Sequence, residues 1–290
     1  MYFKLKQYCS KVYKNKALKN YSTIKIGGKA KYVCFPKTKT DVVDLVNYLN
    51  LKKIKYFVLG AGSNVLINSR GFNGVVIKLD NLNEIYEFDN TIQVGAGVRL
   101  SSVVNYYLKK GYCGFEQAVG IPGTIGGAVV MNAGAYSYKT ENVVKGVTFI
   151  KNGKVDYYVA EQCEFSYRHS IFDDSYIILS VDLKKELGNV DIINNMMRST
   201  MELRKKLPHQ PSLGSVFKRH NEVIVSRLID SLGLKGKRVG DAMVSFEHAG
   251  VIVNLNNASS KDVKQLISLI KNECYQKEKI ELQEEIRYLN

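Results

Sequence analysis

The stretch from Gly120 to Tyr138, GIPGTIGGAVVMNAGAYSY, has a composition suited to holding a cofactor. It contains five glycines and no charged residue. Glycine inside a helix or strand costs roughly 0.5–1 kcal/mol relative to alanine, so this density indicates positive φ angles or close approach of a ligand. The neutrality indicates burial against a large group, and we expect a dinucleotide cofactor. The alternative is a glycine-rich packing corner in the core, because glycine motifs often occur without a ligand.

A second glycine-containing stretch, GAGSN from Gly60 to Asn64, follows a strand expected at Lys55 to Leu59. The apolar run after it, Val65 to Ile67, is short and ends at Asn68-Ser69, so it is not a helix. A Rossmann fingerprint requires a strand, a glycine turn and a helix, and this loop fails that test. A strand, a loop and a strand can still bind a pyrophosphate through consecutive backbone N–H groups.

Helices and strands that would position these loops are indicated by the spacing of apolar residues. An amphipathic helix is expected from Asp41 to Leu51 with Thr40 as its N-cap, and another carries Leu100, Val103, Val104, Tyr107 and Leu108 on one face. A helix over Val190 to Lys206 is expected to pack into the core through Ile193, Met196, Met197, Thr200 and Leu203. A helix is also expected around Val223 to Leu232, and Ser259 or Ser260 caps the last one. Strands are expected at Gly74 to Leu79, Thr91 to Val94, Val147 to Lys151, Val155 to Val159, Tyr176 to Leu183 and His248 to Asn254.

The composition is that of a globular chain of 290 residues, 45% hydrophobic, which is long enough to bury a large core. Five widely spaced cysteines without a Cys-x-x-Cys pair argue against a disulfide framework or a zinc site, so we expect reduced thiols, no metal and a cytoplasmic location. The first twenty residues carry lysines and no apolar h-region, so neither a signal peptide nor a membrane span is expected.

The charge balance, 42 Lys and Arg against 27 Asp and Glu, gives a net charge of +15, which attracts anions. The lysines are spread along the chain and form no block or nucleic-acid-binding motif. A solvated basic surface is therefore the favoured interpretation.

Seven motifs, taken in order, resemble the UDP-N-acetylmuramate dehydrogenase family, also called UDP-N-acetylenolpyruvoylglucosamine reductase. They are IGGKA (26–30), LGAGSNVLI (59–67), GIPGTIGGAVVMNAGAY (120–136), YRHS (167–170), GSVFKR (214–219), GKRVGDAMVSFEHAGVIVN (236–254) and EEIR (284–287). The resemblance covers nearly the whole chain and is closest to the short subclass that lacks an inserted tyrosine loop.

This resemblance implies an α+β protein with a vanillyl-alcohol-oxidase-type FAD-binding fold. Two α/β subdomains, 1–79 and 80–207, would bind FAD, and a C-terminal α/β domain, 208–290, would bind substrate; Pro208 and Pro211 mark that boundary. FAD would be non-covalently bound, with NADPH as co-substrate. The enzyme would be a monomer that reduces the enolpyruvyl ether of UDP-N-acetylglucosamine-enolpyruvate in peptidoglycan precursor synthesis, with neither nucleic acid nor membrane as partner.

The same resemblance assigns the site residues. Arg168, Ser215 and Glu285 would be catalytic, with Ser215 as the proton donor. Lys218 and Arg219 would bind the substrate diphosphate. The flavin would be bound by Gly60, Ala61, Gly62, Ser63, Asn64, Pro122, Gly123, Thr124, Gly126, Gly127, Ala128, Val129 and Asn132.

The chain departs from the family pattern at three positions that bear on substrate contacts. Leu213 and His220 replace a small residue and a proline around the Gly-Ser motif, and Gln283 stands where a glutamate is common. Apart from the resemblance, Arg168 reads as a surface cation, Ser215 as a turn residue and Glu285 as a partner of Arg287.

Two other functions are compatible with the sequence. Another flavin oxidase of the same fold would react readily with oxygen and ignore the UDP-sugar. A basic nucleic-acid-binding protein would lose affinity steeply with salt, because phosphate contacts release counterions.

Overall fold

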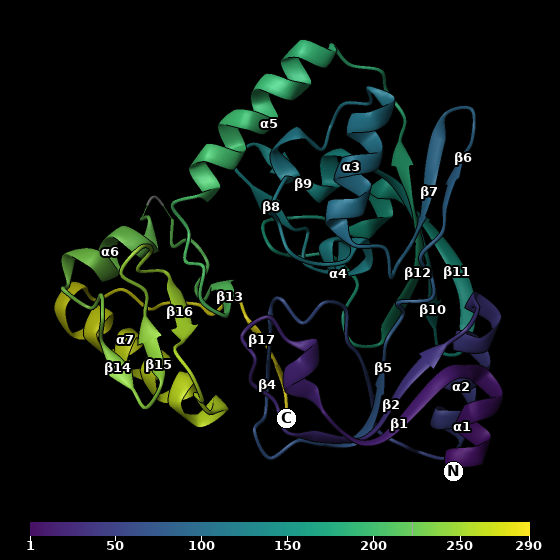
Figure 1. Ribbon diagram of the computed structural model, residues 1–290, viewed down its shortest axis with the longest axis horizontal. Coiled ribbons are helices and arrows are strands. Elements are labelled where there is room, and N and C mark those ends of the chain that lie inside the picture. Colours follow the sequence, from purple (N-terminus) through teal and green to yellow (C-terminus); the bar gives the residue numbers. More distant parts are fainter. Residues whose placement is uncertain (222) are drawn as a thin grey trace. The chain divides into compact units, whose positions relative to one another are not determined.

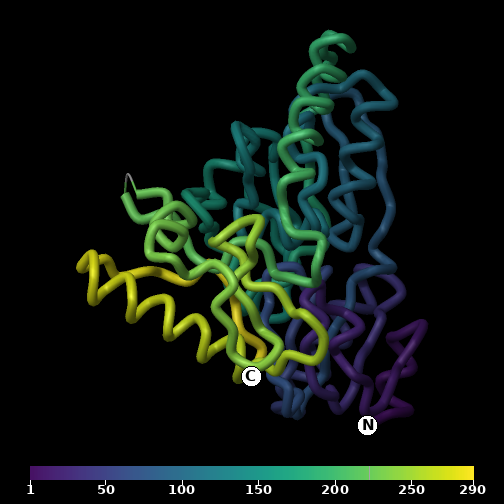
Figure 2. Tube along the Cα trace, turned by 60° about the vertical axis from the view of Figure 1, so that its left-hand side comes forward, coloured from purple at the N-terminus to yellow at the C-terminus, as the bar shows by residue number. Residues whose placement is uncertain are grey.

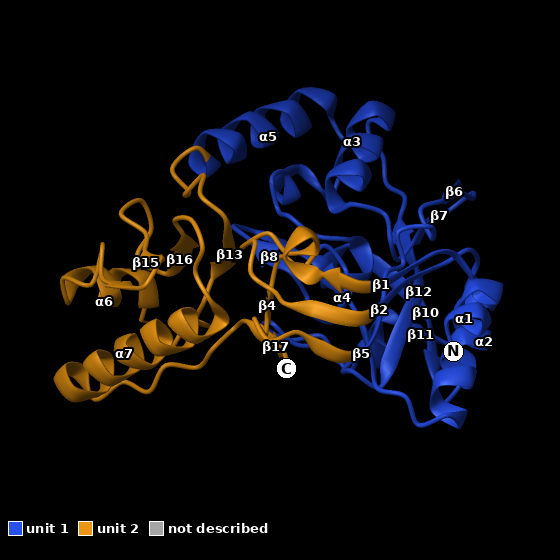
Figure 3. Cartoon of the chain, turned by 60° about the horizontal axis from the view of Figure 1, so that its bottom comes forward, with its two compact units in different colours: residues 1–14, 32–61, 74–204 blue, residues 15–31, 62–73, 205–290 orange. Residues whose placement is uncertain are grey.

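The structure is a computed structural model that describes residues 1–221 and 223–290. The chain forms two compact units, each built from three separate segments (Figure 3). Unit 1 comprises residues 1–14, 32–61 and 74–204, and unit 2 comprises residues 15–31, 62–73 and 205–290. The division into domains 1–79, 80–207 and 208–290 follows chain order and stays a prediction, whereas these units follow contacts.

Unit 1 contains a five-stranded antiparallel sheet in the order β11-β10-β12-β7-β6 (Figure 1). Its strands are β6 (Ile85–Glu87), β7 (Thr91–Gly95), β10 (Val144–Lys151), β11 (Lys154–Val159) and β12 (Tyr176–Lys184). The first six side chains of β12 are buried. Beside this strand, the rings of Phe149 and Phe172 pack edge to face. The expected strands at Thr91, Val147, Val155 and Tyr176 are confirmed.

A four-stranded sheet has the order β1-β2-β5-β3. Its strands are β1 (Cys9–Ala17), β2 (Lys29–Pro36), β3 (Tyr56–Val58) and β5 (Phe72–Ile77). In unit 1, β3 pairs in parallel with β5, so the carboxyl ends of these two strands lie at the same edge. The strands expected at Lys55 and Gly74 are confirmed, and β1 and β2 were not expected.

The helices of unit 1 are α1 (Tyr2–Tyr8), α2 (Lys39–Leu51), α3 (Leu100–Lys110), α4 (Ile125–Val130) and α5 (Val190–Arg204), and β8 (Gly134–Ala135) pairs with β9 (Tyr138–Lys139). The expected N-cap of α2 was wrong. Thr38, not Thr40, caps this helix, because Thr38 and Asp41 form a reciprocal capping box. The expected apolar face of α3 is confirmed by the burial of four side chains.

Helix α5 was expected to pack into the core through five side chains, and this was wrong for two of them. Ile193 and Thr200 are buried, whereas Met196 and Leu203 are 37% and 46% exposed. The helix, green in Figure 2, therefore packs through a narrower stripe than its apolar spacing indicated.

Unit 2 contains a four-stranded sheet and a two-stranded sheet. The first has the order β13 (Ser212–Ser215), β16 (Val251–Asn254), β15 (Ala242–Val244) and β14 (Arg238–Val239). The second pairs β4 (Val65–Ile67) in parallel with β17 (Arg287–Leu289). Its helices are α6 (Val225–Ser231) and α7 (Ser260–Glu278); Ser259 caps α7, as expected, and Val263, Leu266, Ile267 and Ile270 are buried in the core of this unit.

Candidate active site

The glycine-rich stretch forms a loop and a short helix in unit 1. Thr124 caps α4, and its hydroxyl accepts a 3.3 Å hydrogen bond from the Gly127 N–H. The N–H groups of Ile125 and Gly126 donate to the carbonyls of Val98 (2.9 Å) and Ala96 (3.1 Å). A Cβ on Gly126 would lie 3.0 Å from the Ala96 Cβ, so glycine is needed there for close packing. A Cβ on Gly127 would meet only the Thr124 hydroxyl, at 3.5 Å.

The first residue of the GAGSN loop, Gly60, lies beside this stretch in unit 1. Gly60 follows β3, and a Cβ on it would lie 2.9 Å from the Thr124 hydroxyl oxygen. The Thr124 hydroxyl therefore takes up the space of a side chain at Gly60, although the two residues are 64 positions apart (124 − 60). Since Gly60 and Gly127 have no side chain, a flat ligand can approach the backbone at these two positions.

The remainder of that loop, Gly62 to Asn64, belongs to unit 2. Gly62 has a φ of +65°, and a Cβ on it would lie 2.2 Å from the Tyr21 carbonyl oxygen. The loop ends at β4, so the expected strand, loop and strand are confirmed. The Asn64 amide donates to the Glu285 carbonyl (3.1 Å), and the Asn64 carbonyl accepts from the Arg287 N–H (2.9 Å).

Arg168 stands on a tight turn that is fastened to the glycine-rich stretch. Ser166 and His169 exchange backbone hydrogen bonds of 3.1 Å across the turn, and Arg168 has a φ of +56°. At one end the Ser166 carbonyl accepts from the Asn132 amide (2.9 Å), and at the other the Ser170 hydroxyl donates to the Val130 carbonyl (2.9 Å).

The Arg168 guanidinium lies over a glycine of the same stretch. Its Nη1 is 3.5 Å from the position that a Cβ on Gly134 would occupy. The same Cβ would lie 2.7 Å from the Tyr138 carbonyl oxygen, so the backbone leaves no room for a side chain. Arg168 is thus a half-buried cation beside the expected cofactor stretch, rather than a mobile group on an open surface.

Asn132, expected at the flavin, uses its whole side chain within the protein. Its amide donates to the Glu141 carboxylate (2.6 Å) and to the Ser166 carbonyl, while its oxygen accepts from the Glu141 N–H (3.0 Å). The residue has a φ of +39° and is 4% exposed. A flavin contact of Asn132 would therefore come from its main chain.

In unit 2, a distortion of β13 directs Ser215. Between Ser212 and Ser215 the register with β16 shifts, and Gly214 has a φ of +73°. Apart from its chain neighbours, no atom in the described part of the chain lies within 4 Å of the position that a Cβ on Gly214 would occupy. Such a bulge turns a side chain away from the regular alternation of a strand. Ser215 is exposed as a result.

Glu285 lies on the strand segment next to Ser215. Its N–H donates to the Val216 carbonyl (2.7 Å), and the Lys218 N–H donates to the Gln283 carbonyl (2.9 Å). The antiparallel backbone contacts therefore bring the segment that carries Ser215 and Lys218 beside the segment that carries Glu285, about seventy positions later in the sequence. Arg219 continues the same segment and is exposed.

Two cations beside the glycine loops were missed by sequence reasoning. Arg204, at the end of α5, lies over the Tyr136 ring at 5.6 Å and fills the space of a Cβ on Gly120. Lys78 is the fourth residue of the run VVIKL and is 2% exposed. A lysine in an apolar run is a signal in the sequence, because a buried lysine needs a partner.

Comparison with known proteins places the chain among reductases of one kind. A family model described as FAD binding domain matches residues 30–155, and one described as UDP-N-acetylenolpyruvoylglucosamine reductase, C-terminal domain, matches residues 206–289. The UDP-N-acetylenolpyruvoylglucosamine reductase of Clostridium novyi is 40% identical over 277 residues, which cover 94% of this chain and 90% of that protein. The chain belongs to the UDP-N-acetylenolpyruvoylglucosamine reductase family.

Other members agree in sequence and in structure. The reductase of Alkaliphilus oremlandii is 39% identical over 275 residues, covering 93% of this chain and 90% of that protein. The crystal structure of the reductase from Thermus caldophilus has a TM-score of 0.85 at 32% identity and covers 97% of this chain and 98% of that one. The expected α+β, FAD-binding fold is confirmed, and the chain is an FAD-dependent oxidoreductase of peptidoglycan precursor synthesis.

The residues of this reductase fit a flavin. The meeting of Gly60 with Thr124 and the open side of Gly127 leave backbone accessible to a planar group. No charged side chain interrupts residues 117–138, so this segment itself places no charge against a neutral ring system.

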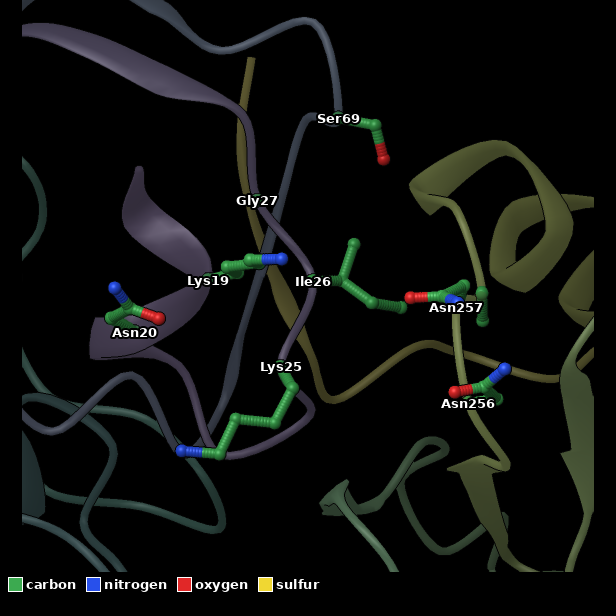
Figure 4. A pocket seen from close by; sticks show the side chains of 9 residues that line it. Lys19, Asn20, Lys25, Ile26, Gly27, Ser69, Asn256 and Asn257 are labelled. Carbon is green, nitrogen blue, oxygen red and sulfur yellow. The ribbon is translucent and has the colours of Figure 1, made fainter. Parts of the chain in front are cut away.

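A separate pocket of about 320 Å³ lies in unit 2 of the reductase (Figure 4). It is lined by Lys19, Asn20, Lys25, Ile26, Gly27, Ser69, Asn256, Asn257 and Ala258, none of which was expected at the site.

Of the helices in the described part of the chain, none is long and apolar enough to cross a membrane. Residues 1–221 and 223–290 hold no group of three or more His, Cys, Asp or Glu side chains arranged for a metal.

Proposed function

We propose that the protein reduces the enolpyruvyl double bond of UDP-N-acetylglucosamine-enolpyruvate, with NADPH as the reductant and Ser215 as the proton donor. The observation that supports this best is the pairing of the Ser215 and Glu285 segments in unit 2, with the glycine-loop residue Asn64 bonded to the Glu285 main chain. Membership of the reductase family supplies the reaction type.

The reaction requires a hydride at the terminal carbon and a proton at the adjacent carbon, and FAD, when bound, supplies the hydride transfer. Negative charge develops on the substrate carboxylate as the double bond is reduced. Arg168 would bind this carboxylate, because a guanidinium stays ionised and donates two parallel hydrogen bonds. Glu285 would orient or polarise the reacting group.

Ser215 would donate the proton. A serine hydroxyl is a weak acid, yet an enolate-like carbon is basic enough to take its proton when the geometry is held. The bulge at Gly214 fixes the backbone that carries this hydroxyl. Lys218 and Arg219, on the same segment, would bind the substrate diphosphate.

The flavin would be bound by Gly60 to Asn64 and by residues 122–129, with Asn132 contributing its main chain. A net charge of +15 would assist capture of NADPH and the UDP-sugar, which are both anions. The five cysteines are free thiols, which suits the reducing cytoplasm. The enzyme would act there as a monomer, with neither nucleic acid nor membrane as a partner.

Two half-reactions measured without oxygen test this function. NADPH should bleach the flavin of the purified protein, and the enolpyruvyl substrate should then restore its colour. NADH at the same concentration is the control for the reductant. Protein that binds no FAD, or reduced protein that responds to oxygen alone, would contradict the proposal.

A further inference from the structure

Lys78 places a buried cation directly beside the first glycine loop. Its side chain is 3% exposed, and its ammonium donates a hydrogen bond to the Gly60 carbonyl. Asp80 lies 3.4 Å away and forms an ion pair with it. Burial lowers the pKa of Lys78, and Asp80 opposes that effect.

The topology of unit 1 explains this meeting. β3 and β5 are parallel neighbours; β3 leads into Gly60, and Lys78 directly follows β5. The Leu59 N–H donates to the Ile77 carbonyl (3.0 Å), so the pairing continues up to the two residues that touch. Lys78 is thus held at the strand edge from which the loop departs.

A closed chain of contacts connects Lys78 with the second glycine loop. Asp80 lies 3.9 Å from the Arg99 guanidinium, and the Arg99 main chain forms a bridge with Thr124. The Thr124 hydroxyl lies beside Gly60, 2.9 Å from the position that a Cβ there would occupy, which returns the series to its start. The first glycine loop is therefore bonded to Lys78 directly, and the second is linked to the Lys78–Asp80 pair through Arg99.

Fixing the Gly60 carbonyl also fixes the N–H of Ala61. These two groups belong to one planar trans peptide and point in opposite directions. Within the described part of the chain, no hydrogen bond engages the Ala61 N–H, although Ala61 is half-buried. A half-buried donor without a protein partner is suited to an anionic ligand oxygen.

We propose that Lys78 is a positioning residue for FAD: by binding the Gly60 carbonyl, it directs the Ala61 N–H toward the cofactor pyrophosphate and ties the two glycine loops together. The inference rests on the flavin contacts proposed above for Gly60 to Asn64. The positive charge of Lys78 also attracts the negatively charged pyrophosphate of FAD. A neutral flavin fragment has no pyrophosphate and would not gain from this attraction.

The test measures ligand affinity of the full-length apoprotein after removal of FAD. Lys78→Met keeps much of the side-chain length and removes the charge, whereas Lys78→Arg keeps the charge. Lys39→Met is the matched control, because the Lys39 ammonium bonds the side chains of Gln93 and Ser180 in the same unit and neither belongs to a glycine loop. FAD and riboflavin, which has no phosphate, are titrated by fluorescence, and thermal melting is recorded with and without FAD.

Lys78→Met should weaken FAD binding about tenfold or more, because a hydrogen bond to a charged group is lost. Riboflavin affinity should change much less, Lys78→Arg should regain part of the FAD affinity, and Lys39→Met should match wild type. Loss of FAD and riboflavin affinity to the same degree would indicate a merely structural lysine and overturn the inference, as would unchanged FAD affinity.

Asp80→Asn covers the case in which Lys78→Met does not fold. The Asp80 side chain is 38% exposed, so this variant should fold, with FAD affinity about threefold weaker and riboflavin affinity unchanged. If Lys78→Met does not fold and Asp80→Asn binds FAD as tightly as wild type, the inference is overturned. Wild-type protein that binds no FAD would instead contradict the proposed function.

Discussion

Asn132 and Glu141 are bonded to each other in both directions. The Asn132 amide donates to the Glu141 carboxylate at 2.6 Å, and the Glu141 N–H donates to the Asn132 oxygen at 3.0 Å. The second amide hydrogen bond reaches Ser166, two residues before Arg168. The pair therefore holds one end of the turn that presents the Arg168 guanidinium.

Replacing this amide should damage the Arg168 turn. Asn132→Ala leaves the Glu141 groups and the Ser166 carbonyl without their partner, which costs about 1–3 kcal/mol of unfolding free energy. Flavin reoxidation by the enolpyruvyl substrate should slow more than flavin reduction by NADPH, because only the former is proposed to use Arg168. Asn47→Ala, at an exposed amide of α2, is the stopped-flow control. Equal slowing of both steps would contradict a role through Arg168.

Gly127→Ala should have different effects on the stability of the apoprotein and on its affinity for FAD. A Cβ at Gly127 meets no atom closer than 3.5 Å, so the apoprotein should be unchanged or gain up to about 1 kcal/mol, since alanine favours helix. The same methyl group would obstruct a flavin that approaches this backbone, so FAD affinity should fall. Urea denaturation of apoprotein and FAD titration measure the two effects. A variant with full FAD affinity would remove Gly127 from the proposed flavin contacts.

Ser215→Ala should separate the two half-reactions. Flavin bleaching by NADPH should keep its rate, because it needs no proton from Ser215. Reoxidation by the enolpyruvyl substrate should slow by roughly 10²–10⁴, the usual contribution of a positioned general acid. Ser215→Cys should retain more activity, and Ser231→Ala, at an exposed serine of α6, should behave as wild type. Near-normal reoxidation in Ser215→Ala would assign the acid to another residue.

Glu87→Gln should reduce stability in a pH-dependent way. The Glu87 carboxylate accepts from the Tyr106 and Tyr112 hydroxyls (2.6 and 2.7 Å) and pairs with Lys110 and Lys185, and these contacts hold its pKa well below the usual range. A lowered folded-state pKa stabilises the protein above the unfolded pKa, and this is lost as pH falls.

The stability difference between wild type and Glu87→Gln should therefore be full at pH 7 and shrink below about pH 4.5, the ordinary range of a glutamate. Urea denaturation across this pH range measures it. Glu84→Gln, at an exposed side chain just before β6, controls for loss of charge. A difference that stays constant down to pH 3 would mean that the carboxylate charge is not the cause.

Local patterns in the sequence predicted the elements that bury one regular face. The apolar spacing of α3 and α7 located both helices, because a single stripe of each is buried. β1 was missed because lysines occupy much of the strand and its buried residues do not alternate. The sequence contains the capping-box pair Thr38 and Asp41, but apolar spacing alone favours Thr40, which lies nearer the apolar run.

The candidate site was less accessible to such reasoning. Residue types and the family resemblance indicated Arg168, Ser215 and Glu285, but nothing in their spacing shows that Asn132 holds the Arg168 turn or that Glu285 pairs with Val216. These contacts join residues far apart in sequence, and local periodicity carries no information about them. Lys78 is an intermediate case. A lysine in the apolar run VVIKL indicates a buried contact, but the run does not show that the Gly60 carbonyl is its partner.

The parallel pairing of β4 with β17 constrains the order in which the protein can fold during synthesis. Asn64, next to β4, and Glu285, next to β17, are 221 positions apart, yet they share a hydrogen bond. When β4 leaves the ribosome its partner strand has not been made, and at about 5–20 residues per second the wait lasts at least ten seconds. During that interval β4 presents unpaired backbone groups. The nascent chain should therefore stay a substrate for chaperones until Leu289 is synthesised, and an early stop codon upstream of β17 should yield an aggregating product rather than a smaller folded one.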